Sequence, residues 1–204
     1  MIKAILFDLD GVLVDACDWH YEALNVALIM NQKQPIPRDL HLTVYNGLPT
    51  HVKLNMLGIS DDEAKDINRL KQLYTLSTIT KHAKIMPEKI EMHKHIKACG
   101  YKIACVTNSI RETAEEMLKA TGQLEYMDLL ITNEDVKNNK PAPDCYNIAI
   151  QKLNADPNQT IIVEDSIKGI EAAKASKVGN CFIVKNTTEV NLNTIGSLLG
   201  NSSL

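Results

Sequence analysis

The chain has 204 residues, of which 45% are hydrophobic and 23% are charged, and its formal net charge is −3. This length and composition suit one sizeable domain, or a domain that carries an inserted module. The absence of a basic excess argues against a nucleic-acid partner, and no apolar run approaches the length that spans a membrane.

The five cysteines and the N-terminus indicate the compartment. The cysteines are odd in number and scattered, and none belongs to a Cys-x-x-Cys pair. We therefore expect free thiols in a reducing compartment. The N-terminus lacks the cationic start, long apolar core and cleavage site of a signal peptide. These features predict a cytoplasmic protein, with a monomer as the default state.

The first element is a short apolar run, Ala4 to Phe7, which predicts a buried strand of a parallel sheet. Asp8, Asp10 and Gly11 follow it at once. Residues i and i+2 of an extended chain point to the same side, so the two aspartates can share a pocket that ends in a glycine turn. Carboxylates about 4 Å apart repel by roughly 4 kcal/mol at a dielectric near 20, so this pocket calls for a cation. Taken alone, the string is better explained by one aspartate that caps a helix and another that is solvated, because so short a string often arises by chance.

The stretch from residue 15 to residue 84 is predicted to be helical throughout. Apolar residues recur at helical spacing from Trp19 to Met30, and two prolines then interrupt the pattern. Further helices are predicted at residues 39–44, at residues 50–57 and from Ser60 onward. Because no strand is predicted here, we expect residues 15–84 to form a helical domain inserted into a core of residues 1–14 and 85–204.

Beyond this insertion, strands alternate with helices. The predicted strands are residues 102–106, 129–132, 160–163 and 180–184. The predicted helices are residues 88–99, 113–121, 146–153, a segment ending at 175, and 189–199. This alternation predicts an α/β fold with a Rossmann-like parallel sheet covered on both faces. In such sheets the active site lies beyond the carboxyl ends of the strands.

Polar residues lie directly after the strand predicted at residues 102–106 and in the loop before the helix predicted at residues 146–153. Thr107, Asn108 and Ser109 follow the second strand, where they could cap a helix or bind an anion at its N-terminus. Lys140 precedes a proline in a polar loop, where a lysine is usually a solvated charge. If that loop closes over the Asp8 pocket, Lys140 would offset the carboxylates and a bound anion.

The fourth predicted strand is followed by Glu164, Asp165 and Ser166. Asp165 or Ser166 could cap the next helix, but the two carboxylates would also lie beside the first pair, and Mg²⁺ prefers such hard oxygen ligands. Gly169 lies inside the following helix, where it costs about 1 kcal/mol relative to Ala. It indicates close contact between helix and strand, although a tolerated glycine would also explain it.

The order of these motifs along the chain resembles that of the haloacid dehalogenase-like hydrolase superfamily, and the resemblance spans nearly the whole chain. The helical insertion is similar to the family's helical cap, and the nearest subgroup includes β-phosphoglucomutase and phosphoglycolate phosphatase. The four motifs are Asp8-Leu9-Asp10-Gly11-Val12, Thr107, Lys140 and Glu164-Asp165.

The resemblance implies a role for each motif residue. Asp8 would be the nucleophile that forms an aspartyl-phosphate, and Asp10 the general acid and base. Mg²⁺ would be held by Asp8, by the backbone carbonyl of Asp10 and by Asp165, with Glu164 as a direct or water-mediated ligand. The transferring phosphoryl group would be bound by Thr107, the backbone of Asn108 and Lys140.

The resemblance therefore implies a Mg²⁺-dependent phosphatase acting on a small phosphorylated metabolite, such as a sugar phosphate or a similar phosphomonoester. Asp10 favours phosphate esters, because the dehalogenases lack an acid at this position and the phosphonatases also differ there. A sugar-phosphate mutase similar to β-phosphoglucomutase is the alternative. A catalytically silent binding module is a third hypothesis, although no motif residue is replaced.

Three residues of the helical insertion are candidates for substrate contact: His20, Asn46 and His51. His20 matches a histidine that gates the second aspartate in the mutase, and it could equally be a polar-face residue of its helix. The mutases usually carry an arginine near residue 47 that holds a second phosphate, and this chain lacks it. Ala16 also replaces the common Ser or Thr.

Overall fold

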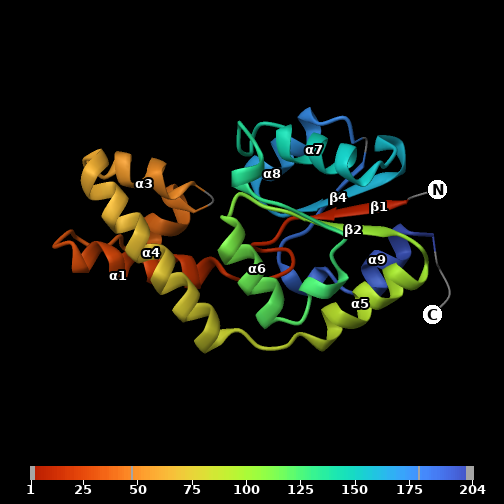
Figure 1. Cartoon of the computed structure of the whole chain (residues 1–204), viewed down its shortest axis with the longest axis horizontal. Coiled ribbons are helices and arrows are strands. Elements are labelled where there is room, and N and C mark those ends of the chain that lie inside the picture. Colours follow the sequence, from red (N-terminus) through yellow and green to blue (C-terminus); the bar gives the residue numbers. More distant parts are fainter. Residues whose placement is uncertain (1–2, 47, 179, 201–204) are drawn as a thin grey trace. The chain divides into compact units, whose positions relative to one another are not determined.

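The computed structural model describes residues 3–46, 48–178 and 180–200, and the chain forms two compact units. Met1–Asp15 and Lys84–Leu204 form a core unit that contains the sheet, and Ala16–Ala83 form a helical unit (Figure 1). The predicted fold class, an α/β Rossmann-like core with an inserted helical domain, is confirmed.

The sheet has five parallel strands in the order β3-β2-β1-β4-β5. The strands are β1 (Ala4–Phe7), β2 (Lys102–Val106), β3 (Leu129–Ile131), β4 (Thr160–Glu164) and β5 (Asn180–Ile183). Strand β2 pairs with one edge of β1, and β3 pairs with the far edge of β2. Strand β4 then pairs with the other edge of β1. Such a switch point opens a crevice at the carboxyl ends of the two strands. Phe7 is paired with Val163, so Asp8 and Glu164 come next to each other at this crevice.

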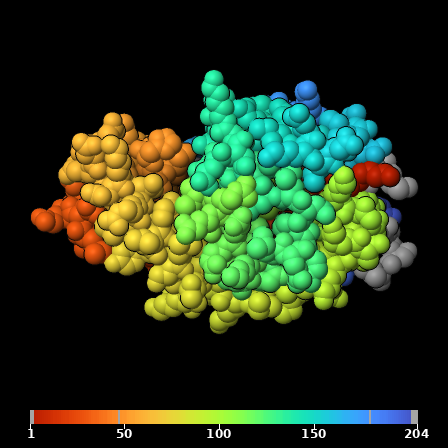
Figure 2. Space-filling view, viewed as in Figure 1, coloured from red at the N-terminus to blue at the C-terminus, as the bar shows by residue number. Residues whose placement is uncertain are grey.

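Helices cover both faces of the sheet. Figure 1 places α7 (Asp144–Leu153) and α8 (Ile167–Ala175) on one face. It places α5 (Pro87–Ala98), α6 (Arg111–Ala120) and α9 (Leu192–Leu198) on the other. Side chains alternate accordingly along β1: Leu6 packs into the cluster with α7 and α8, whereas the ring of Phe7 contacts His93 of α5. Figure 2 shows the outer surface of these covering helices and loops, beneath which all of β1 is buried.

The helical unit has a small core of its own. Its elements are α1 (Cys17–Met30), α2 (Arg38–Leu40), a π-helical turn (His41–Tyr45), α3 (Thr50–Met56) and α4 (Asp61–His82). Leu24 and Leu28 of α1 pack with Leu54 and Ile67. A capping box between Ser60 and Glu63 starts α4. Among the described residues, no helix combines the length and the apolar character needed to cross a membrane.

Several predicted bounds differ from the structure by one or two residues, and two elements differ in kind or by more. The helix predicted at residues 39–44 is a single α-helical turn that continues as a π-helical turn. The helix predicted at residues 189–199 begins only at Leu192, because the Asn191 side chain accepts the backbone N–H of Thr194 and caps the helix there. A separate 3₁₀ turn, Thr187–Glu189, precedes it.

Candidate active site

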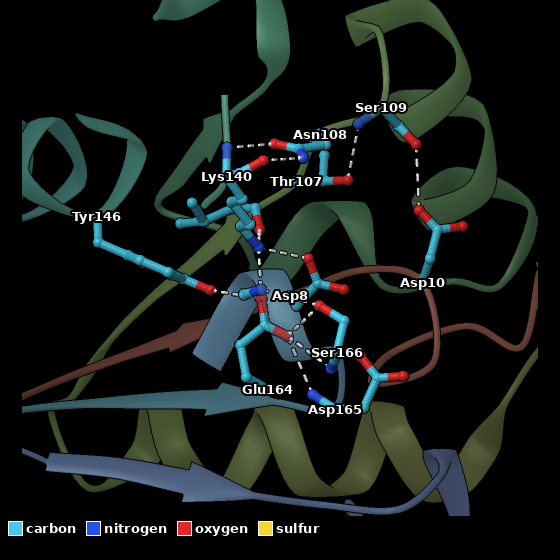
Figure 3. A network of polar contacts seen from close by, with 12 residues as sticks. Asp8, Asp10, Thr107, Asn108, Ser109, Lys140, Tyr146, Glu164, Asp165 and Ser166 are labelled. Atoms are coloured by element: carbon cyan, nitrogen blue, oxygen red, sulfur yellow. Dashed lines mark hydrogen bonds and ion pairs between the residues drawn. The ribbon is translucent and has the colours of Figure 1, made fainter. Parts of the chain in front are cut away.

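Polar side chains from four separate segments gather at the carboxyl ends of β1, β2 and β4 (Figure 3). Asp8 follows β1, Thr107 follows β2, and Glu164 is the last residue of β4. Lys140 comes from the loop that precedes α7 and reaches both Asp8 and Glu164. The structure therefore brings one residue of each predicted motif to a single edge of the sheet.

Lys140 lies at the centre of the buried part of this site. Only 4% of the residue is exposed, and its Nζ donates to Asp8 Oδ1 at 2.6 Å, to Glu164 Oε1 at 2.7 Å and to the Val106 carbonyl at 2.8 Å. These three contacts match the three protons of an ammonium group. Burial lowers the pKa of Lys140, but Asp8 and Glu164 outweigh it and hold the pKa well above its ordinary value. The lysine is therefore a fixed cation between two carboxylates.

Glu164 is completely buried and accepts five hydrogen bonds. Its Oε1 accepts from Lys140 Nζ and from the Tyr146 hydroxyl, each at 2.7 Å. Its Oε2 accepts the backbone N–H groups of Asp165 and Ser166 and the Ser166 hydroxyl, at 3.0–3.1 Å. Burial raises the pKa of Glu164, but Lys140 and these donors bring it below its ordinary value. Glu164 is thus an ionised carboxylate whose acceptor positions are filled by the protein.

Gly169 explains how this carboxylate fits between β4 and α8. A Cβ atom at Gly169 would lie 1.7 Å from Glu164 Oε1, so every other residue type would collide with the carboxylate. The predicted close contact of this glycine is confirmed, and its partner is the side chain of Glu164.

The sequence alone assigned no role to Tyr146, which is the first residue of the helix predicted at residues 146–153. Tyr146 is fully buried, and its ring centroid lies 4.9 Å from Lys140 Nζ in addition to the hydroxyl contact with Glu164. A signal was present, because a tyrosine among buried apolar positions normally has a hydrogen-bond partner.

Asn108 connects the loop after β2 to the loop of Lys140. Its Oδ1 accepts the backbone N–H of Lys140 at 3.1 Å, and its Nδ2 donates to the Lys140 carbonyl at 3.3 Å. Thr107 is also buried, and its Oγ1 accepts the backbone N–H of Ser109 at 3.0 Å. The Asn108 side chain therefore fixes the backbone that carries the buried lysine.

Asp10 lies on the opposite side of the site. Its carboxylate turns away from Lys140 and accepts the Ser109 hydroxyl at its Oδ2, at 3.1 Å (Figure 3). The two aspartates of the first motif thus have different surroundings: Asp8 is fixed by a buried cation, whereas Asp10 is contacted by a hydroxyl.

A group of three carboxylates could hold a metal ion. Asp8, Glu164 and Asp165 each offer one ligand atom, and these atoms all lie within 4.8 Å of one another. Asp10, also predicted in the metal set, contributes no side-chain atom to this group, and its backbone carbonyl stays a predicted ligand. Asp165 Oδ1 is buried and has no hydrogen-bond partner among the described residues.

The electrostatics of these carboxylates also suit a divalent cation. Burial, reinforced by Glu164, raises the pKa of Asp165 to about 6. Burial also raises the pKa of Asp8 well above its ordinary value, although Lys140 opposes this. Both shifts arise mainly from burial, and the neighbouring carboxylates add to them. Gly11, with a φ of +86°, leaves room for the Asp165 carboxylate, since a Cβ there would lie 2.1 Å from Oδ2.

The three candidates for substrate contact lie in the helical unit. His20 is on α1, with its Nδ1 3.3 Å from Lys71 Nζ. Asn46 follows the π-helical turn and accepts from the Cys17 thiol at 3.6 Å. His51 is exposed on α3.

Comparison with known proteins gives consistent matches along nearly the whole chain. A family model described as haloacid dehalogenase-like hydrolase matches residues 5–183. The phosphorylated carbohydrates phosphatase of Thermotoga maritima is 28% identical over 188 residues, which cover 89% of this chain and 84% of that protein. The phosphoglycolate phosphatase of Nitrosospira multiformis is 28% identical over 181 residues, which cover 86% and 80% of the two chains.

Solved structures show the same fold. β-Phosphoglucomutase from Clostridium difficile matches with a TM-score of 0.80 and 23% sequence identity, and the match covers 98% of each chain. At this level of identity the likeness concerns the fold, which agrees with the sheet order and the helical insertion described above.

Proposed function

The chain belongs to the haloacid dehalogenase-like hydrolase family, and on this premise we propose that it is a Mg²⁺-dependent phosphatase that hydrolyses a small phosphorylated metabolite through an aspartyl-phosphate. A sugar phosphate or a similar phosphomonoester is the proposed substrate. The observation that carries the proposal is the buried ion-pair network in which Lys140 holds Asp8 beside Glu164. The names of the Thermotoga and Nitrosospira relatives support the same reaction class.

The proposed reaction has two steps, and both use the first motif. A carboxylate oxygen of Asp8 attacks the phosphorus atom, the bond to the leaving oxygen breaks, and Asp10 donates a proton to that oxygen. Asp10 then accepts a proton from the water that attacks the aspartyl-phosphate, which releases phosphate and restores Asp8. The first step leaves Asp10 without its proton and the second step returns one, so the complete cycle restores the protein's proton count.

The buried part of the site supports this chemistry by holding charge in place. Lys140 fixes the orientation of the Asp8 carboxylate by donating a hydrogen bond to Asp8 Oδ1. The nucleophile therefore needs little rearrangement before attack. Thr107 and the backbone of Asn108 are proposed to bind the phosphoryl oxygens at the start of the segment that leads into α6.

A bound Mg²⁺ would supply charge stabilisation for the transferring phosphoryl group. Asp8, Asp165 and the Asp10 carbonyl are its proposed ligands. The hydrogen bonds that fill both oxygens of Glu164 argue against direct ligation of the metal by this residue. Its proposed contribution is then to fix the position of Lys140 and of the Asp165 backbone.

A panel of phosphorylated metabolites tests the proposal on the purified full-length chain. Sugar phosphates, phosphoglycolate and pyrophosphate are incubated with Mg²⁺ or with a chelator, and released phosphate is measured. We expect release from at least one ester, loss of activity with the chelator and recovery with added Mg²⁺. Asp8→Asn should be inactive, whereas Asp66→Asn, an exposed change in the helical unit, should retain full activity.

The same panel separates the other hypotheses. A mutase would isomerise a sugar phosphate, would need a bisphosphate activator and would release no phosphate. A binding module would act on no ester under any condition. Full activity of Asp8→Asn would contradict the proposed role of this residue.

A further inference from the structure

Ser109 contacts the carboxylate of Asp10 within the core unit. Its hydroxyl donates to Asp10 Oδ2 at 3.1 Å, across 99 positions of sequence (Figure 3). The sequence suggested this serine only as a helix cap or an anion ligand, and the ion-pair network around Lys140 does not include it. Its contact therefore calls for an explanation of its own.

The backbone of Ser109 is held from both sides. Its N–H donates to Thr107 Oγ1 at 3.0 Å, and its carbonyl accepts the N–H of Asn133, which follows β3, at 3.2 Å. On a backbone anchored in this way, the serine oxygen has three staggered positions, and the one that it takes directs the hydroxyl to Asp10.

Asp10 has a reason to need such a donor. It is only half-buried and lies two residues from Asp8, and the two carboxylates repel each other. Lys140 reaches Asp8 and Glu164 and leaves Asp10 outside its contacts. Proton transfer requires the acid within about 2.6–3.2 Å of the leaving oxygen, and a misplacement of about 1 Å can cost about a hundredfold in rate.

We propose that Ser109 is a positioning residue that orients the Asp10 carboxylate for proton transfer to the leaving oxygen. This inference rests on the proposed phosphatase reaction. The serine proton stays on Ser109 throughout, because the hydroxyl only donates a hydrogen bond to Oδ2. The proton that moves is the one that Asp10 gives to the leaving oxygen and later takes from water.

The identity of the leaving group distinguishes this role from a general loss of structure. A sugar alkoxide is a poor leaving group and needs the proton of Asp10, whereas p-nitrophenolate is stable without it. A defect confined to the general acid therefore slows the hydrolysis of a sugar phosphate much more than that of p-nitrophenyl phosphate. A distorted phosphate or metal site slows both.

The test compares Ser109→Ala with wild type on p-nitrophenyl phosphate and on the sugar phosphate that wild type hydrolyses fastest. We expect kcat/KM, which reports formation of the aspartyl-phosphate, to fall about tenfold to a hundredfold on the sugar phosphate and less than about threefold on p-nitrophenyl phosphate. Ser109→Thr, which keeps a hydroxyl, should recover most of the loss in kcat/KM. In an Asp10→Asn background, Ser109→Ala should add no further discrimination between the two substrates.

Ser166→Ala is the matched control, because it removes another hydroxyl bound to a carboxylate of the same site, that of Glu164. It should affect both substrates alike. Equal losses on both substrates in Ser109→Ala, unchanged turnover of the sugar phosphate, or a full additional effect in the Asp10→Asn background would overturn the inference. A wild-type chain that hydrolyses neither ester would instead defeat the proposed function, and the inference would fall with it.

Discussion

The site has an inner half, which contains Lys140 and Glu164, and an outer half, which contains Asp165. The two halves differ in how many of their polar atoms have hydrogen-bond partners within the protein. In the inner half, Lys140 uses three contacts and Glu164 accepts five, and neither is exposed by more than 4%. In the outer half, Asp165 Oδ1 is buried without a partner among the described residues, and the pKa of this residue is raised to about 6. Folding alone supplies the hydrogen-bond partners of the inner half, whereas the outer half retains negative charge that suits a cation.

This contrast follows from what each half is proposed to do. Groups that only orient others work best when folding fixes them in advance, since they then need no rearrangement during the reaction. Carboxylates that bind a cation or transfer a proton must keep oxygen lone pairs available for that cation or proton.

The largest effect is expected from Lys140→Met. This change leaves the buried carboxylates of Asp8 and Glu164 without their cation, which should lower the free energy of unfolding by about 3–5 kcal/mol and kcat by about a hundredfold to a thousandfold. Urea unfolding and phosphate release measure the two effects. Lys137→Met, an exposed change three residues earlier, should alter stability by less than about 0.5 kcal/mol. Equal stability of the two variants would refute the importance of the buried pair.

The next largest effect is expected from Gly169→Ala. The new methyl group would occupy the place of the Glu164 carboxylate. The free energy of unfolding should therefore fall by about 2–3 kcal/mol, despite the better helix propensity of alanine. Gly196→Ala in α9 is the matched control, because no atom lies within 4 Å of the added methyl group. That variant should be more stable by about 0.5–1 kcal/mol. A stabilising effect at both glycines would contradict the close contact.

Tyr146→Phe should have a smaller effect. It removes one of the five donors to Glu164 and keeps the ring beside Lys140, so we expect a loss of about 1–2 kcal/mol in stability and up to about tenfold in kcat. Denaturant titration and steady-state kinetics measure both. Tyr101→Phe, where no hydroxyl contact is found among the described residues, should behave as wild type. If Tyr146→Phe and Tyr101→Phe had the same stability and the same kcat, the Tyr146 hydroxyl would have no role in the network.

The smallest effect concerns the outer half and depends on pH. Because the pKa of Asp165 is about 6, a cation must displace a proton below that pH, and Mg²⁺ affinity should fall by about tenfold per pH unit. In the metal-free protein the raised pKa means that this group's contribution to stability is lost as pH rises from about 4 to about 6. Calorimetric Mg²⁺ titrations at pH 5 and pH 7.5 test this, and constant affinity would contradict it.

The sequence predicted the parts of the molecule that depend on local patterns. β1 and β2 have the predicted bounds, because each is an apolar run that ends at a polar residue. The last helix was placed too early, because its start depends on the Asn191 cap rather than on apolar spacing. Element positions were therefore predictable to the extent that they follow from periodicity.

Contacts between distant segments were less predictable. Lys140 lies in a polar loop, and nothing local indicates that its side chain reaches below the strand ends to the Val106 carbonyl. Tyr146 and Ser109 acquire their partners only when β4 and β1 come next to the segments that carry them. The motif order predicted which loops meet, and tertiary packing decided which neighbouring residues support them.

The most direct test of the account is to trap the aspartyl-phosphate. The chain is mixed with Mg²⁺ and the best ester of the panel and quenched in acid during turnover, and peptide mass spectrometry then locates the phosphoryl group. The account predicts a phosphoryl group on Asp8 that is absent from Asp8→Asn and from samples with chelator. Sustained phosphate release with Asp8 unmodified, or a phosphoryl group on another residue, would contradict it.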